Sequence, residues 1–364
     1  MTARDRFLLD PEVVYLNHGA FGACPRAVFE TYQRWQRELE RAPVDLFERR
    51  LRRELAGVRE ALGAYVGAPA NDLALVLNAT AGMNAVLRSL PLATGDEILT
   101  TEHEYGAIEL LLAYVAERSG ARIVTASGVD ADAIWAAATP RTRALVLSHV
   151  TSPTALLLPV EELCRRAREA DVLSVVDGAH GPGQLPLDLE RLGADFYAGN
   201  CHKWLCAPKG AGFLYGRPER QGLVEPLVTG WGYGTSPFAL AHDWESTRDP
   251  AAYLAVPAAI AFVREHARTE ECRQLLRRGS TLLADAGFEP LAPVQPLQMA
   301  AFRLPECDPK AVQRRLFEEF RIEVPVRTWN GGQLLRVSIA PYNELSDVAA
   351  LAAALARVLT RSSA

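Results

Sequence analysis

The sequence predicts an α/β protein with a mainly parallel, seven-stranded sheet flanked by helices and a smaller α+β domain. From about residue 72, short runs rich in Val, Ile and Leu alternate with segments whose apolar residues recur at helical spacing. This alternation is typical of βαβ units, whose strands are buried on both faces. After about residue 250 the pattern becomes mainly helical. The chain of 364 residues also exceeds the size at which one hydrophobic core keeps growing, which favours two domains.

The elements can be assigned in chain order. Residues 26–66 carry apolar positions at helical spacing, and Pro43 interrupts them, so two helices that meet near Ala42 and Pro43 are expected. Strands of the large sheet are then predicted at residues 72–77, 96–101, 121–126, 143–150, 171–177, 195–200 and 210–215. In the C-terminal part, helices are predicted at 251–267, 270–287 and 310–320, and strands at 299–304, 322–326 and 334–340.

Domain boundaries follow from this change of character. We expect a large domain over residues 26–255 and a small C-terminal α+β domain over residues 256–364, with the boundary inside the long helical stretch. Internal repeats and low-complexity tracts, which would suggest a different architecture, are not seen in the sequence.

Composition excludes several functional classes. The chain is 49% hydrophobic and 23% charged, as in ordinary globular proteins, and its formal net charge of -5 argues against a nucleic-acid partner. The N-terminus lacks the apolar run of a signal peptide, and no stretch of 18 uncharged apolar residues follows, so we expect a soluble cytoplasmic protein without a membrane partner. The six cysteines are scattered without zinc-ligand spacing, so reduced thiols and no metal are expected.

Polar residues cluster directly after the predicted strands. Ligands bind at the carboxyl ends of strands in parallel sheets, so these residues are expected to converge on one site. The five clusters are Asn78 to Thr80, His103 to Tyr105, Ser148 to Ser152, Asp177 to His180 and Asn200 to Lys203.

Asp177 lies at the end of one predicted buried strand and Lys203 follows the end of another, where an unpaired charge would cost several kcal/mol. A partly desolvated amine has a lowered pKa and can form an imine with an aldehyde cofactor. A carboxylate beside a pyridine nitrogen keeps that nitrogen protonated, so the ring can accept electrons. The pair therefore predicts pyridoxal 5'-phosphate (PLP), although an isolated Asp of this kind can also be a helix N-cap and an isolated Lys a solvated charge.

The chain resembles the class V aminotransferase family of PLP enzymes (fold type I), in its isopenicillin N epimerase-like branch. The segments that carry the resemblance run in family order over nearly the whole chain: YLNHGAFG (15–22), NATAGMN (78–84), TTEHEYGAIE (100–109), SHVTSPTALLLPV (148–160), VDGAHGPGQLPLDL (176–189), ADFYAGNCHKWLCAPKGAGFL (194–214), STRDPAAYLAVPAAI (246–260) and LLRVSIAPYN (334–343). The VDGAH to HKW portion is highly specific.

The resemblance implies a set of cofactor contacts. Lys203 forms the internal aldimine, Asp177 pairs with the pyridinium nitrogen, and His180 and Ser152 lie near the 3-oxygen of PLP. Contacts to the phosphate are implied for Ala79, Thr80, Asn200 and His202, and for Thr247, which in this family often reaches the phosphate of the partner subunit. A homodimer with active sites at the interface is therefore expected. Tyr105 is favoured as the residue that stacks on the cofactor ring, with His103 as the second choice.

For the substrate, the resemblance implies that Arg336 binds the carboxylate, since its fork geometry suits bidentate contact. The N-terminal segment 1–25 is expected to contribute to the small domain and the active site, with Asn17 and His18 near the substrate. Arg248 is a further candidate for substrate binding.

The catalytic residues expected are Lys203, Asp177, Tyr105 and His180, acting on an amino acid through an external aldimine and a quinonoid. Lys203 removes the α-proton, and the next step decides among epimerisation, expected first, β-elimination by a C–S lyase, and transamination. His18, Tyr105 and water are candidates for the second acid. The resemblance also disfavours cysteine desulfuration. Desulfurases of this family need a nucleophilic cysteine on the loop before the carboxylate-binding arginine, and residues 324–336 contain no cysteine. A non-catalytic binding or regulatory protein of the same fold is the alternative from another class.

Overall fold

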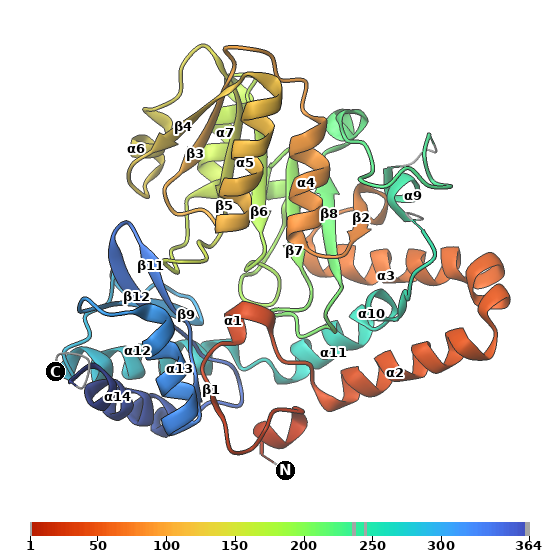
Figure 1. Ribbon diagram of the computed structural model, residues 1–364. Coiled ribbons are helices and arrows are strands. Elements are labelled where there is room, and N and C mark those ends of the chain that lie inside the picture. The colour runs from red at the N-terminus through yellow and green to blue at the C-terminus, as the bar shows by residue number, and fades with distance from the viewer. Residues whose placement is uncertain (1, 235–237, 244–245, 361–364) are drawn as a thin grey trace.

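The computed structural model describes residues 2–234, 238–243 and 246–360 and shows two domains side by side (Figure 1). The larger one holds a seven-stranded sheet in the order β2-β8-β7-β6-β5-β3-β4. Strands from β7 to β4 pair in parallel, whereas β8 is antiparallel to β2 and β7. The strands are β2 (Leu73–Val76), β3 (Glu97–Thr101), β4 (Arg122–Ala126), β5 (Thr142–Ser148), β6 (Leu173–Gly178), β7 (Phe196–Asn200) and β8 (Gly212–Gly216). The predicted fold class and all seven predicted strands are confirmed.

Helices cover both faces of this sheet because successive strand residues point to opposite sides. Val175 packs in the core beneath α4 and α5, whereas Val176 packs in the core beneath α3 and α7. The large-domain helices are α2 (Arg26–Arg41), α3 (Leu51–Val66), α4 (Ala79–Ser89), α5 (Gly106–Ser119), α6 (Ala131–Trp135), α7 (Val160–Glu169), α8 (Leu189–Leu192), α9 (Phe238–Asp243), α10 (Ala251–Leu254) and α11 (Val256–His266). Shorter turns are η1 (Arg4–Arg6), η2 (Asp45–Arg50), η3 (Ala70–Asp72) and η4 (Pro218–Leu223). The predicted break between α2 and α3 is confirmed.

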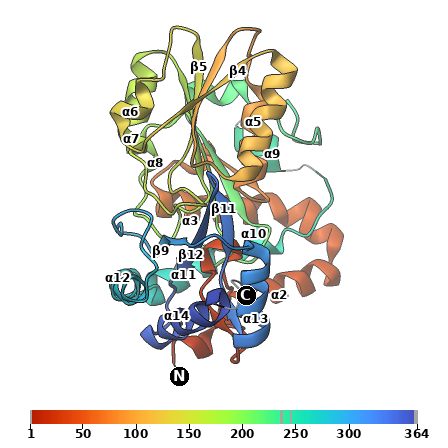
Figure 2. The same cartoon turned by 60° about the vertical axis from the view of Figure 1, so that its left-hand side comes forward.

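The small domain packs helices against an antiparallel sheet of order β11-β12-β9 (Figure 2). Its elements are α12 (Thr269–Asp285), β9 (Met299–Leu304), α13 (Pro309–Phe320), β10 (Ile322–Glu323), β11 (Val326–Trp329), β12 (Gly332–Ser338) and α14 (Leu345–Thr360). A separate hydrophobic core joins these elements. The buried face of α11 belongs to the large-domain core, and the small-domain core takes up the chain from α12. By side-chain packing, the change of core falls between α11 and α12, inside the helical stretch where the boundary is expected, and the division into domains at residue 255 stays a prediction.

The N-terminal segment connects the two domains. Its strand β1 (Val14–Tyr15) pairs in parallel with β10 of the small domain, and α1 (His18–Phe21) follows at once. In Figure 1, α1 lies between the small domain and the lower ends of the large-sheet strands. No helix in the described ranges combines the length and apolar character needed to cross a membrane.

Candidate active site

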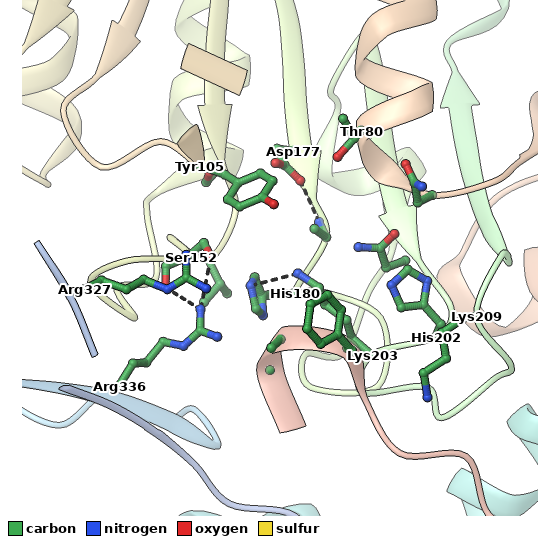
Figure 3. A pocket seen from close by; sticks show the side chains of 18 of the residues that line it. Thr80, Tyr105, Ser152, Asp177, His180, His202, Lys203, Lys209, Arg327 and Arg336 are labelled. Carbon is green, nitrogen blue, oxygen red and sulfur yellow. Dashed lines mark hydrogen bonds between the residues drawn. The ribbon is translucent and has the colours of Figure 1, made fainter. Parts of the chain in front are cut away.

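A cavity of about 310 Å³ opens where the large sheet meets α1 and the small domain. Residues that follow β5, β6 and β7 line it, together with the start of α4 and two arginines of the small-domain sheet (Figure 3). The expected convergence of strand ends is therefore present. Nine predicted site residues line this cavity: Thr80, Tyr105, Ser152, Asp177, His180, Asn200, His202, Lys203 and Arg336.

His180 holds the amine of Lys203 at one side of the cavity. The Nε2 atom of His180 lies 3.1 Å from Lys203 Nζ, and its Nδ1 atom accepts a hydrogen bond of 3.2 Å from the indole N–H of Trp204. An indole can only donate, so Nδ1 of His180 must be unprotonated and the ring hydrogen lies on Nε2. His180 therefore presents an N–H to Lys203, and this contact favours the uncharged amine.

Burial acts on Lys203 in the same direction. The pKa of Lys203 is lowered to about 7, chiefly by desolvation; the charge of Asp177 raises it, and the charges of Arg336 and Arg327 lower it. Burial, and then the nearby Lys203 charge, hold the pKa of His180 well below its usual range. Near neutral pH, Lys203 is therefore a mixture of charged and uncharged amine, which suits both attack on an aldehyde and removal of a proton.

Asp177 is the penultimate residue of the central strand β6 and is 5% exposed. Its Oδ1 atom accepts a hydrogen bond of 2.9 Å from the backbone N–H of Ala179. Desolvation raises the pKa of this carboxyl, although the Ala179 bond and Lys203 lower it. A cation placed in the cavity beside Asp177 would stabilise the carboxylate.

The first turn of α4 leaves one backbone donor for a ligand. Asn200 Oδ1 accepts from the N–H of Ala79 at 2.8 Å, Asn78 Oδ1 accepts from Ala81 at 2.9 Å, and the Asn78 carbonyl accepts from Gly82. Within the described residues, the N–H of Thr80 has no such acceptor, and Thr80 lines the cavity. A helix start with a free N–H suits an anion.

Arg336 enters from β12 of the small domain and is 4% exposed. One terminal nitrogen donates to both the carbonyl oxygen (2.6 Å) and the hydroxyl oxygen (3.1 Å) of Ser152. Burial, and then the charge of Arg327, lower the pKa of Arg336 to about 10. The Nε atom of Arg336 is buried without a hydrogen-bond partner in the described structure. A buried, incompletely bonded guanidinium is suited to a carboxylate ligand.

Tyr105 and His103 take different positions. Tyr105 precedes the first residue of α5, is 41% exposed and lines the cavity. The ring of His103 is buried, stacks on Trp329 at 5.0 Å between centroids, and faces Thr154 at 3.2 Å from its Nδ1. The placement favours Tyr105 over His103 as the residue that stacks on a ligand.

Asn17 and His18, expected near the substrate, are outside the cavity lining. The side chain of Asn17 donates to Glu323 at 3.1 Å. Both ring nitrogens of the buried His18 contact protein atoms, namely the hydroxyl of Tyr342 and the carbonyl of Lys203. This placement does not favour direct substrate contact, because no ring nitrogen of His18 is left for a ligand.

Three further predicted residues also lie outside the cavity lining. Ala79 is buried, and its N–H donates to the side-chain oxygen of Asn200. Thr247 is exposed on the surface of the chain, so a contact with a partner subunit stays a prediction. Arg248 donates to the hydroxyl of Tyr253 at 2.5 Å and stacks over its ring, which gives it a structural contact within the chain.

Sequence reasoning missed three residues of the site. Arg327 on β11 and Lys209 line the cavity, and Trp204 fixes the ring of His180. A signal for Arg327 was its position directly after the predicted strand 322–326, nine residues before Arg336. The signals for Trp204 and Lys209 were their positions one and six residues after Lys203.

The residues present fit PLP. A buried carboxylate, Asp177, can meet the ring nitrogen, and the amine of Lys203 can meet the aldehyde. The helix start at Thr80, with Asn200 and His202 in the same cavity lining, offers donors to a phosphate.

Comparison with known proteins agrees with this assignment. The profile of the aminotransferase class-V family matches residues 14–351. Two isopenicillin N epimerases are each 38% identical to the chain over 97% of its length: that of Streptomyces clavuligerus, of which 96% is covered, and that of Amycolatopsis lactamdurans, of which 97% is covered. A probable chloroplastic L-cysteine desulfhydrase of Arabidopsis thaliana is 28% identical over 93% of the chain and 81% of its own length.

A solved structure of a variant of C-DES, with glycine covalently linked to its PLP cofactor, superposes with a TM-score of 0.85. The two sequences are 25% identical, and the match covers 97% of this chain and 98% of the other. The profile match, the near-full-length relatives and the PLP-binding structural neighbour agree with the site described above, and the chain is therefore a PLP-dependent member of the class V aminotransferase family.

Proposed function

We propose that this enzyme inverts the configuration at the α-carbon of an amino-acid substrate, as an isopenicillin N epimerase-like enzyme. The observation that carries the proposal is the 38% identity to two isopenicillin N epimerases over 97% of the chain. The site supports it with two groups able to carry a proton, Lys203 and Tyr105, which reach the cavity from different elements (Figure 3).

Each residue has a distinct part in this reaction. PLP, when bound, accepts the electron pair that is left at the α-carbon once a bond to that carbon breaks. Arg336 binds the substrate carboxylate through its free guanidinium N–H groups. Lys203, uncharged in part at neutral pH, takes the α-proton. Tyr105 holds a hydroxyl proton for the opposite side of the α-carbon.

Other residues would hold the cofactor. Asp177 would keep its ring nitrogen protonated, and the start of α4 at Thr80 would receive its phosphate with Asn200 and His202. The lone pair of the uncharged Lys203 amine accepts the N–H that His180 presents, so this contact favours the uncharged form and opens when Lys203 takes a proton.

The test is incubation of the PLP-loaded protein in deuterated water with a panel of possible substrates. The panel holds L-amino acids, cysteine conjugates, and peptides in which one residue keeps both its α-amino and its α-carboxylate group free. Exchange of the α-proton, the chirality of the substrate and released keto acid are followed together. Exchange with loss of chirality and without keto acid is the expected result. If a keto acid forms together with a sulfur-containing product, the reaction is β-elimination and the proposal of epimerisation is wrong.

Two variants assign the proton carriers. Lys203→Ala should abolish exchange with every substrate, since the base is lost. Tyr105→Phe should retain exchange at the face of Lys203 but lose inversion. Inversion at an unchanged rate in Tyr105→Phe would transfer the second acid role to water or to another group.

A C–S lyase that cleaves cysteine conjugates by β-elimination is the second candidate, favoured by the similarity to the probable L-cysteine desulfhydrase. Desulfuration through a protein persulfide is disfavoured. Four of the six cysteines are buried, and no cysteine lines the cavity in the described structure. Transamination remains the third outcome of the same first proton transfer.

We further propose a homodimer whose interface borders the active site. Phe21 lines the cavity and is 69% exposed, and Leu110 on α5 is 74% exposed, so both present apolar surface that a partner would cover. Thr247 is exposed and therefore accessible to a partner subunit, whose phosphate it is expected to contact. Light scattering during size-exclusion chromatography should give twice the chain mass. The free cysteines accord with the predicted cytoplasmic location.

A further inference from the structure

His18 contacts the backbone of Lys203, the lysine proposed to transfer the proton. Its Nε2 atom is 3.0 Å from the carbonyl oxygen of Lys203, and its Nδ1 atom is 2.8 Å from the hydroxyl of Tyr342. The residue is 1% exposed, and its ring packs against Trp204 at 5.0 Å between centroids. The ring thus bridges the lysine loop of the large domain and Tyr342 beyond the last strand of the small domain.

The hydrogen-bond roles in this bridge are fixed by the partners. A carbonyl oxygen only accepts, so the ring hydrogen of His18 lies on Nε2 and is donated to Lys203. The other nitrogen, Nδ1, then accepts from the hydroxyl of Tyr342. Burial holds the pKa of His18 at about 3, so the ring stays neutral at physiological pH.

The chain around His18 is fitted closely to the lysine loop. Gly22 has a φ of +67°, and a Cβ atom added there would lie 1.9 Å from the carbonyl oxygen of His202. On the other side, the small domain holds the same segment, because Asn343 donates to the carbonyl of Tyr15 at 3.0 Å. The N-terminal segment is therefore fixed at both ends, and His18 is the side chain that reaches Lys203.

We propose that His18 is a positioning residue for Lys203. Through Tyr342, His18 connects the small domain to the backbone that carries the reactive amine. This role rests on the proposed function of Lys203 as the proton-transferring base. By fixing the carbonyl of Lys203, His18 keeps the Nζ atom in contact with His180 and in its desolvated position. This positioning role differs from the substrate contact that the sequence suggested for His18.

Two substitutions of His18 test the role. His18→Gln keeps an N–H near the position of Nε2, whereas His18→Leu fills the space without a donor. The matched control is Asn343→Ala, which removes a bond to the same N-terminal segment without touching His18 or Lys203. The charged and titratable groups that face Lys203 are unchanged in all three variants: Asp177, His180, His202, Arg327 and Arg336.

The measurement is a pH titration of the visible absorbance band of the PLP-loaded resting protein, which needs no substrate. In His18→Leu, the released backbone lets water reach the nitrogen of Lys203, which favours its charged form. The midpoint should rise by about half a pH unit, roughly a three-fold change in the protonation constant. His18→Gln and Asn343→Ala should retain the wild-type midpoint. In parallel, kcat should fall in His18→Leu while KM changes little, since substrate contacts are kept.

An unchanged midpoint in folded His18→Leu, or an equal shift in Asn343→Ala, would overturn the proposal. If His18→Leu does not fold, Tyr342→Phe decides, because it weakens the bridge from the other end and should move the midpoint upward by a smaller amount. No shift in Tyr342→Phe would then count against the role. Failure of the proposed function is separate, as it appears as absent α-proton exchange in the wild-type enzyme while the resting-band titration still reports on His18.

Discussion

The tautomer of His180 depends on one indole, and Trp204→Phe removes it. The substitution deletes the hydrogen bond of 3.2 Å that keeps Nδ1 of His180 unprotonated. The ring can then carry its hydrogen on Nδ1 and turn the Nε2 lone pair toward Lys203, so the charged amine gains an acceptor. The pKa of Lys203, about 7 in the wild type, should therefore rise.

The size of this effect follows from the energy of the lost bond. A net hydrogen bond is worth about 1 kcal/mol, which corresponds to a rise of about 0.7 in pKa. At pH 7 the uncharged fraction of Lys203 would fall from about one half to about one sixth. The rate of α-proton exchange at pH 7 should drop by about three-fold and recover at higher pH, where the amine is uncharged in both proteins.

The assay is the pH dependence of α-proton exchange at saturating substrate. Trp329→Phe is the matched control, since its indole also donates a hydrogen bond, to the carbonyl of Glu102 at 3.1 Å, but does not contact His180. A profile in Trp204→Phe that overlays the wild type, or a similar displacement in Trp329→Phe, would refute the assignment of the His180 tautomer. Thermal unfolding of both variants separates this effect from loss of packing.

Three further outcomes are expected. The Asp177→Asn variant should still bind PLP, but its exchange rate should be lower by about a hundred-fold or more, because the ring nitrogen loses its carboxylate. Asp195 is a buried acid away from the cavity, so the control Asp195→Asn should lower stability without changing the cofactor spectrum. Burial raises the pKa of Glu104 to about 7, above its unfolded value of 4.5, so its contribution to stability is present below pH 4.5 and is lost as pH rises through 7; urea titrations should show this pH dependence in the wild type and not in Glu104→Gln. Gly178→Ala should lower the free energy of unfolding by about 1–3 kcal/mol and reduce activity, because a Cβ would lie 1.9 Å from the ring of Tyr197, and a wild-type urea midpoint would contradict this.

The fold was predictable because each strand carries its own signal. The seven runs are short and mainly apolar, because most strands of this largely parallel sheet are buried on both faces. Pro43 marks the expected break between α2 and α3. The boundary between the domains was less visible. Residues 251–267 have helical periodicity, but a helix there could pack against either domain. Only side-chain packing shows that α11 belongs with the large-domain core.

Within the site, the sequence alone identified the residues whose chemical type is rare at a buried strand end. Asp177 and Lys203 need a partner there, and that need pointed to the cofactor. Tertiary structure decided what depends on distant contacts: Trp204 sets the tautomer of His180, and Arg327 joins Arg336 through strand pairing. His18 illustrates the difference, because its place in the N-terminal segment suggested a substrate contact, while its two ring nitrogens are taken by Tyr342 and Lys203, more than 180 residues away in the chain.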